Sequence, residues 1–335
     1  MKTKFLNALL LTAAIFSLSI TPAHAQNGAP ASMDELAPAS KASRALPASG
    51  PTPAATSPVP DIKPLEPIDA DPALWVVKDK DTTIYLFGTV HVLKPNLLWF
   101  DEAVKTAFDS SDQMMIEMVE PPAPEMQAIF GTLAVDPNGK KLRSKLNAAD
   151  LKIYEAALTK LGLPAVQLDA LEPWAVAVMM QVLSVTKEGY DPASGAEAVL
   201  TAAAKKAGKP VTGFETAEYQ LGIFDTLPED KQIRFLIDGS ADLDKGKEQM
   251  DALVSNWASG NPEALAKLMN EGMEDPVLYK KLLTDRNANW AAWIKQRMAK
   301  PGTVFVAVGA GHLSGPTSVP ALIKKKGLKA VRLKY

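Results

Sequence analysis

One sequence unit occurs twice in this chain, and it limits the folds that the chain can adopt. An apolar run over residues 83–87 leads into Gly88-Thr89-Val90-His91, and a second over residues 303–308 leads into Gly309-Ala310-Gly311-His312. A helical pattern and a further apolar run follow each motif. Strands that alternate with helices in this way are typical of α/β sheets. We therefore expect a strand, Gly-x-x-His, helix, strand unit at each end of the folded part.

Between these two units the pattern is mainly helical. The apolar runs that predict strands are residues 74–77, 83–87, 113–118, 210–214, 303–308 and 330–333. The predicted helices are residues 101–110, 148–161, 173–187, 195–207, 228–259, 262–272 and 276–298. The first two runs flank a polar turn, which predicts a hairpin. We predict an α/β fold with a mixed sheet, built from the two end units, and a large central helical insertion.

The first residues predict export. Lys2 and Lys4 precede an apolar run over residues 5–20, and Ala23-His24-Ala25 follows it. This arrangement is typical of a secretory signal peptide, so we expect residues 1–25 to be removed after Ala25 and the protein to be periplasmic or secreted. No later run has the length of a membrane span, and the chain has no cysteine. We therefore expect no membrane span, no lipid anchor, no disulfide and no thiolate metal ligand.

The residues after the predicted signal peptide divide into two parts. Residues 26–70 are dominated by Pro, Ala and Ser, with almost no aromatic or β-branched side chains. Such a segment buries too little apolar surface to offset its chain entropy, so we predict a disordered linker. Residues 71–335 have the length and composition of one large domain.

The charge balance excludes one class of partner. Without Lys2 and Lys4, the 36 basic residues fall to 34 against 38 acidic ones. The dense basic run Lys324-Lys325-Lys326 is explained by a solvated helix face near the end of the chain. We expect no nucleic acid partner.

The histidines are few and similarly placed. The sequence has three, and His24 leaves with the predicted signal peptide. His91 and His312 each lie three residues after a glycine, at the carboxyl end of a predicted strand, where open α/β sheets bind ligands. A single histidine in this position is usually a structural residue, but two in the same setting favour function. Two imidazoles without a cysteine nucleophile suggest a divalent metal.

Glu117 is the candidate for a third ligand, because a metal of this kind normally takes a carboxylate as well. It interrupts the apolar run over residues 114–118, where an unpaired charge is costly to bury. A metal ion or an arginine would compensate it. The alternative is a glutamate on an edge strand that faces water.

Five short segments resemble one family. They are Tyr85-Leu86-Phe87-Gly88-Thr89-Val90-His91, Met115-Ile116-Glu117, Gly213-Phe214-Glu215-Thr216, Asp285-Arg286-Asn287 and Val308-Gly309-Ala310-Gly311-His312-Leu313. In this order they resemble the TraB/GumN family, which is related to the Tiki metalloproteases, over nearly all of the chain after the linker. The resemblance implies a peptidase that uses one divalent metal ion of the manganese or cobalt type, with zinc as an alternative. It places His91, His312 and Glu117 at the active site.

Glu215 and Arg286 are candidates of a second rank. Glu215 follows a predicted strand, and it would bind metal, hold Arg286, or simply precede a helix. Arg286 lies in a predicted helix, where a solvated position is the default. The resemblance favours a functional arginine, which would grip a substrate carboxylate or steady the charge on an attacked carbonyl.

These features favour an exported, divalent-metal-dependent hydrolase, with a peptide or protein as substrate. In this hypothesis His91, His312 and Glu117 hold the ion, and a metal-activated water attacks a carbonyl. Glu117, if it is not a ligand, or Glu215 moves the proton. The alternative is a non-catalytic periplasmic accessory protein that binds a metal, haem or a partner through the same cleft. The glycines of the second motif also suggest a dinucleotide-binding turn, but no acidic residue follows at the end of the next predicted strand.

Overall fold

The computed structural model describes residues 65–270 and 275–335. The predicted signal peptide and residues 26–64 of the predicted linker lie outside these residues. The described start of the chain includes strand β1 (Ile68–Asp69), which pairs in parallel with β4 (Leu97–Leu98). Ala70 is buried. The folded part thus includes residues that composition assigned to the end of the linker, because Ile68 and Asp69 have a pairing partner about 30 positions later.

The centre of the fold is a six-stranded mixed sheet in the order β6-β5-β7-β3-β2-β8. Its strands are β2 (Leu74–Lys78), β3 (Thr82–Thr89), β5 (Gln113–Met118), β6 (Val211–Glu215), β7 (Gly302–Gly309) and β8 (Val331–Leu333). Strands β6, β5, β7 and β3 run parallel, while β2 is antiparallel to both β3 and β8. The mixed sheet, the hairpin of β2 and β3, and all six predicted strands are therefore confirmed.

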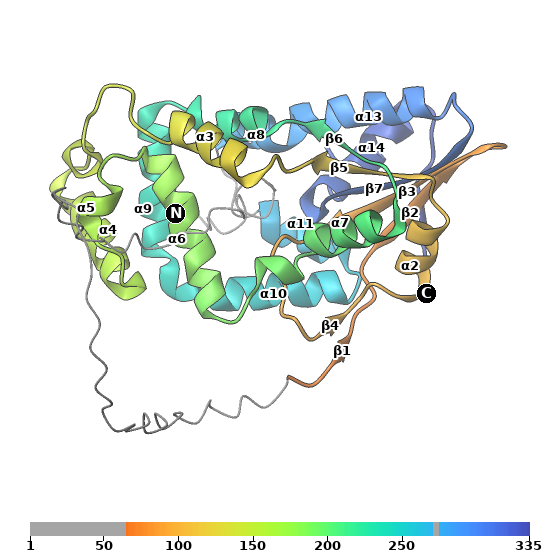
Figure 1. The fold of residues 1–335 in the computed structure, drawn as a ribbon, viewed down its shortest axis with the longest axis horizontal. Coiled ribbons are helices and arrows are strands. Elements are labelled where there is room, and N and C mark those ends of the chain that lie inside the picture. The colour runs from red at the N-terminus through yellow and green to blue at the C-terminus, as the bar shows by residue number, and fades with distance from the viewer. Residues whose placement is uncertain (1–64, 271–274) are drawn as a thin grey trace, which may run out of the picture. The chain divides into compact units, whose positions relative to one another are not determined.

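Both faces of the sheet are buried at its centre, as the nearly continuous apolar sequence of β7 requires. Val304, Val306 and Val308 lie in one core with residues of α13 (Asp285–Arg297) and α14 (Val319–Lys325). Phe305 and Ala307 lie in the other core with residues of α2 (Glu102–Asp109) and α10 (Gly246–Ala258). Figure 1 shows α13 and α14 along one side of the strands and α2 away from them.

The chain leaves the two central strands in opposite directions. From β3 it continues through α2 to β5, and from β7 it continues through α14 to β8 at the other edge. Crossovers between parallel strands are right-handed. Because the two crossovers run in opposite directions across the sheet, their helices α2 and α14 lie on opposite faces of it. Adjacent strands that diverge in this way form a topological switch point, where α/β sheets bind ligands. The switch point lies between β3 and β7, the strands that carry the two Gly-x-x-His motifs.

The central insertion is helical, as predicted. The remaining helices are α3 (Ala123–Leu133), α4 (Ala148–Leu161), α5 (Ala165–Leu168), α6 (Pro173–Lys187), α7 (Ala196–Ala207), α8 (Ala217–Asp225), α9 (Glu229–Ala241), α11 (Pro262–Asn270) and α12 (Pro276–Tyr279). Helices α4, α6 and α9 gather away from the sheet (Figure 1). The predicted helix over 228–259 is two helices, because a 3-10 turn at Leu243–Lys245 separates α9 from α10. Within the described residues, no helix is both long and apolar enough to cross a membrane.

Candidate functional site

The carboxyl edge of the parallel strands brings the candidate residues together. Glu215 ends β6, Glu117 lies near the end of β5, and the turns after β7 and β3 carry His312 and His91. The end of β3 touches the turn after β7, because a Cβ added to Gly88 would lie 3.0 Å from Cα of Ala310. Four adjacent strands thus present their functional residues at one edge of the sheet.

Arg286 lies at the centre of this edge. Its Nε lies 2.9 Å from Oε1 of Glu215, and its Nη2 lies 2.8 Å from Oε2 of the same carboxylate. The same Nη2 donates to Oε2 of Glu117 over 2.5 Å. The side chains of Arg286 and Glu117 are fully buried, and that of Glu215 is 8% exposed. One guanidinium therefore compensates two buried carboxylates, which answers how the chain buries Glu117.

The helix that carries Arg286 begins irregularly. A π-helical turn at Lys280–Thr284 immediately precedes α13. Arg286 Nη1 donates to the carbonyl oxygen of Leu282 over 3.1 Å, and the guanidinium lies over the ring of Trp290 at 4.9 Å. π-helical turns are rare and occur frequently at functional sites, because the extra residue redirects a side chain.

His312 is held on both sides of its ring. Its Nδ1 lies 2.6 Å from Oδ1 of Asn287, whose Nδ2 donates to the carbonyl oxygen of Thr317. This second bond assigns the amide orientation, so Nδ1 of His312 carries the proton and Nε2 has the lone pair. Nε2 lies 3.2 Å from Nη1 of Arg286 and 3.6 Å from Oε1 of Glu117.

His91 has its own acidic partner, which sequence reasoning did not identify. Its Nδ1 lies 2.9 Å from Oε1 of Glu197 in α7, and the hydroxyl of Thr89 donates to the same oxygen. The start of α7 fits closely against the His91 turn, because the amide of Ala196 donates to the carbonyl of Val90 over 2.9 Å. A Cβ on Gly195 would overlap the carbonyl of His91. The glycine therefore allows the approach that places Glu197 beside His91.

Burial and charge shift the pKa values of these groups. Burial lowers the pKa of His91, but the charge of Glu197 and its hydrogen bond outweigh burial and raise the pKa above 6.5. Burial raises the pKa of Glu197, yet His91 and Thr89 outweigh it and lower the pKa below 4.5. Burial also raises the pKa of Glu117, although Arg286 and His91 act in the opposite direction. The His91–Glu197 pair thus favours its charged form.

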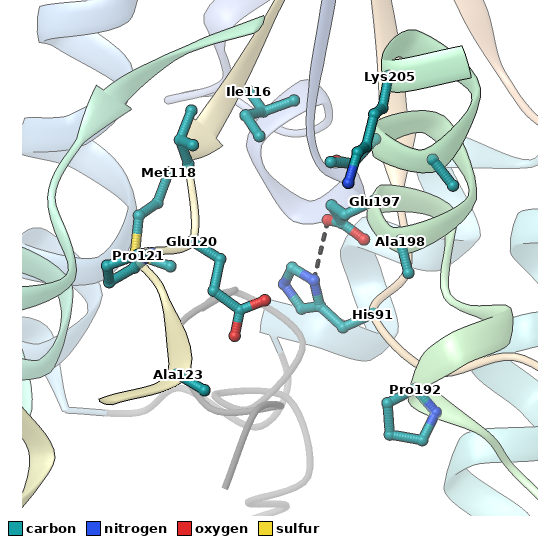
Figure 2. A pocket seen from close by; sticks show the side chains of 13 residues that line it. His91, Ile116, Met118, Glu120, Pro121, Ala123, Pro192, Glu197, Ala198 and Lys205 are labelled. Carbon is teal, nitrogen blue, oxygen red and sulfur yellow. Dashed lines mark ion pairs between the residues drawn. The ribbon is translucent and has the colours of Figure 1, made fainter. Parts of the chain in front are cut away.

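A pocket of about 490 Å³ opens beside His91 and Glu197. It lies between α7, the end of β5 and the start of α3, and Figure 2 shows His91 paired with Glu197 at its wall. Much of the lining is apolar, including Ile116 and Met118. Its volume is in the range of small-molecule and peptide sites.

The donor atoms fit a metal in their chemistry. Both imidazoles engage Nδ1 with an oxygen acceptor, the arrangement in which Nε2 is presented to a metal ion. As they lie, no three His, Cys, Asp or Glu side chains among the described residues are grouped closely enough to hold one ion. Arg286 contacts Nε2 of His312 and Oε2 of Glu117, two atoms that a shared ion would use. An ion bound by these residues would require Arg286 to release at least one of them.

Sequence reasoning missed three polar residues of this edge. Glu197 pairs with His91, Asn287 orients His312, and Gln220 donates to Oε2 of Glu215 over 2.9 Å. Asn287 lies next to Arg286 in the segment Asp285-Arg286-Asn287, so the sequence motif could have indicated that it belongs to the site. Glu197 and Gln220 follow helix starts with no feature that distinguishes them from capping or surface residues.

The fold and this edge define a class: mixed α/β proteins with a charged site at a topological switch point, beside an apolar pocket. The profile of the TraB/PrgY/gumN family matches residues 73–332, and the chain belongs to that family. An uncharacterized protein of Treponema pallidum is 23% identical over 276 residues, which cover 76% of this chain and 80% of that protein. The uncharacterized protein YbaP of Escherichia coli K12 is 23% identical over 257 residues, which cover 76% of this chain and 92% of YbaP. YbaP of Shigella flexneri has the same identity and coverage. No solved structure matches the chain.

Proposed function

We propose that this protein is an exported, divalent-metal-dependent hydrolase that cleaves peptides. The observation that carries the proposal is the pair of histidines at the switch point, each with Nδ1 engaged by an oxygen acceptor, together with the pocket of about 490 Å³ that His91 lines. The resemblance of the motifs to the Tiki metalloproteases supports the peptidase class. The sequence of residues 1–25 supports export.

The residues that would hold the ion are His91, His312 and Glu117, with a manganese or cobalt type favoured and zinc as the alternative. When bound, such an ion polarises a carbonyl and lowers the pKa of water. Glu197 holds the ring of His91 in one orientation through Nδ1. Glu215, which is 8% exposed, remains partnered with Arg286 or accepts a proton from water. Once released from Glu117, Arg286 would provide a guanidinium to stabilise negative charge on an attacked carbonyl.

The test is metal content and peptide turnover of the same samples. Purified protein is loaded with manganese, cobalt or zinc, measured by mass spectrometry for bound metal, and screened against a peptide library. His312→Ala and Glu117→Gln should lose metal and turnover together, whereas Glu218→Gln on the exposed start of α8 should lose neither. Full metal content and activity in the His312→Ala and Glu117→Gln variants would show that the metal site is elsewhere.

A second function has its own support. Arg286 already pairs with both Glu117 and Glu215, so neither carboxylate depends on a metal ion for a cationic partner. This favours the non-catalytic alternative, in which the protein binds a metal, haem or a partner in the periplasm. Wild-type protein that binds metal but cleaves no peptide in the library would support this alternative over the hydrolase.

A further inference from the structure

The pocket beside His91 has two charged side chains that the proposed chemistry does not use. Glu120 follows the end of β5 and Lys205 lies in the last turn of α7, so they belong to different walls. Figure 2 shows the carboxylate of Glu120 and the ammonium of Lys205 both directed into the pocket. Apolar side chains such as Met118 and Ile116 fill the lining between them.

The other charged groups of the pocket already have partners. His91 and Glu197 form an ion pair over 2.9 Å, so together they add no net charge when both are ionised. Glu120 and Lys205 form no ion pair with another residue in the described parts of the chain. Burial raises the pKa of Glu120, and no neighbouring cation counteracts it. The side chains of Glu120 and Lys205 are also exposed, so the pocket has one anion and one cation at its rim beside a largely apolar lining.

We propose that this pocket binds a short apolar peptide by both of its free ends, with the amino group at Glu120 and the carboxylate at Lys205. The volume of about 490 Å³ suits a ligand of a few residues. The carboxylate of Glu120 and the ammonium of Lys205 complement the charged amino and carboxyl ends of such a peptide, and its side chains contact the apolar wall. This inference rests on the proposed function, because it names the substrate class of the same site, and binding tests it separately from turnover.

The experiment measures binding of alanyl-leucyl-alanine to the full protein by calorimetry, in its free, N-acetylated, C-amidated and doubly blocked forms. The wild type should prefer the free peptide to either singly blocked form by about two- to fivefold, the usual effect of one exposed ion pair. Glu120→Gln should weaken the free and C-amidated peptides by about two- to fivefold and leave the N-acetylated one unchanged. Lys205→Met should do the converse, weakening the free and N-acetylated peptides only.

Two neighbouring variants serve as controls. Lys206→Met removes an exposed ammonium next to Lys205 on α7, and Glu125→Gln removes an exposed carboxylate on α3. Neither residue lines the pocket, so both variants should bind all four peptides as the wild type does. Equal binding of the free and doubly blocked peptides, or equal losses in Lys205→Met and Lys206→Met, would overturn the inference.

Mass spectrometry of the recovered peptides separates this inference from the proposed function. Binding that follows the charge pattern without cleavage supports the peptide pocket and refutes the hydrolase. Cleavage with no dependence on the peptide ends supports the hydrolase and refutes this use of Glu120 and Lys205.

Discussion

Nη2 of Arg286 lies 2.5 Å from Oε2 of Glu117, and both side chains are fully buried. The pair is 169 positions apart in the sequence and joins helix α13 to strand β5. Because Glu215 accepts from the same guanidinium, one arginine pairs with both buried carboxylates of this edge. Loss of this side chain would leave both carboxylates without that partner.

Arg286→Ala should destabilise the protein by about 3–5 kcal/mol, because it leaves two buried carboxylates without compensation. Urea denaturation followed by circular dichroism measures the loss. Arg234→Ala, on an exposed face of α9, should change stability by less than about 0.5 kcal/mol. Combining Arg286→Met with Glu117→Gln should recover part of the loss, since one buried charge is then also removed. An Arg286→Ala variant as stable as the wild type would contradict the ion-pair core.

Glu197→Gln should lower the pKa of His91, because the charge of Glu197 opposes the effect of burial and raises that pKa. Protonation of His91 stabilises the fold below its ordinary pKa of 6.5, and this contribution is lost as pH rises through the higher folded value. Ionised Glu197 stabilises the fold above 4.5, and its contribution is lost as pH falls through its lower folded value. The cost of Glu197→Gln should thus be greatest between pH 4.5 and 6.5.

Nuclear magnetic resonance of the metal-free protein checks the titration, since the sequence has only three histidines to assign. His91→Ala identifies the resonance. Glu218→Gln, which removes an exposed carboxylate from α8, should leave the His91 titration unchanged. An unchanged pKa in Glu197→Gln would mean that this pair does not form in solution.

Gly195→Ala should destabilise the protein by about 1–3 kcal/mol, since the added Cβ meets the carbonyl of His91 and pushes α7 from the His91 turn. If peptides are cleaved, turnover should fall as well, because Glu197 moves with the helix. Gly131→Ala in α3 is the matched control. A Cβ there meets nothing within 4 Å, so that variant should gain about 0.5–1 kcal/mol. Thermal denaturation of both variants measures the difference in stability. Equal melting temperatures would refute the close contact between Gly195 and the carbonyl of His91.

Asn287→Ala should cost about 1–3 kcal/mol, because it leaves Nδ1 of His312 and the carbonyl of Thr317 without their buried partner. If His312 is a metal ligand, metal affinity should also fall by about 10–100-fold. Asn289→Ala lies on the same helix at an exposed position and should change neither quantity. Competition with a fluorescent chelator measures the affinity, and equal affinity in both variants would exclude the orienting role of Asn287.

Local sequence signals were sufficient for the six strands of the central sheet and for most of the helices, but not for β1, β4, α3, α5 and α8. The central strands were predictable because apolar runs of that length are buried on both faces of a sheet, as β7 is. The boundary between α9 and α10 was missed because helical periodicity continues through the short turn at Leu243–Lys245. Motif spacing also placed His91, His312, Glu117 and Glu215 at strand ends.

Only the tertiary structure determined which side chains pair with His91, His312, Glu117 and Glu215. The sequence by itself determined that Glu117 needs a compensating cation, since a charge inside an apolar strand is costly to bury. It left open whether a metal or an arginine lies beside Glu117, and the packing of α13 against the sheet brings Arg286 to this carboxylate. The pairing of His91 with Glu197 likewise depends on Gly195, which brings α7 against a turn 104 positions earlier. Such pairings are set by how helices pack on the switch point, and neither periodicity nor composition encodes that packing.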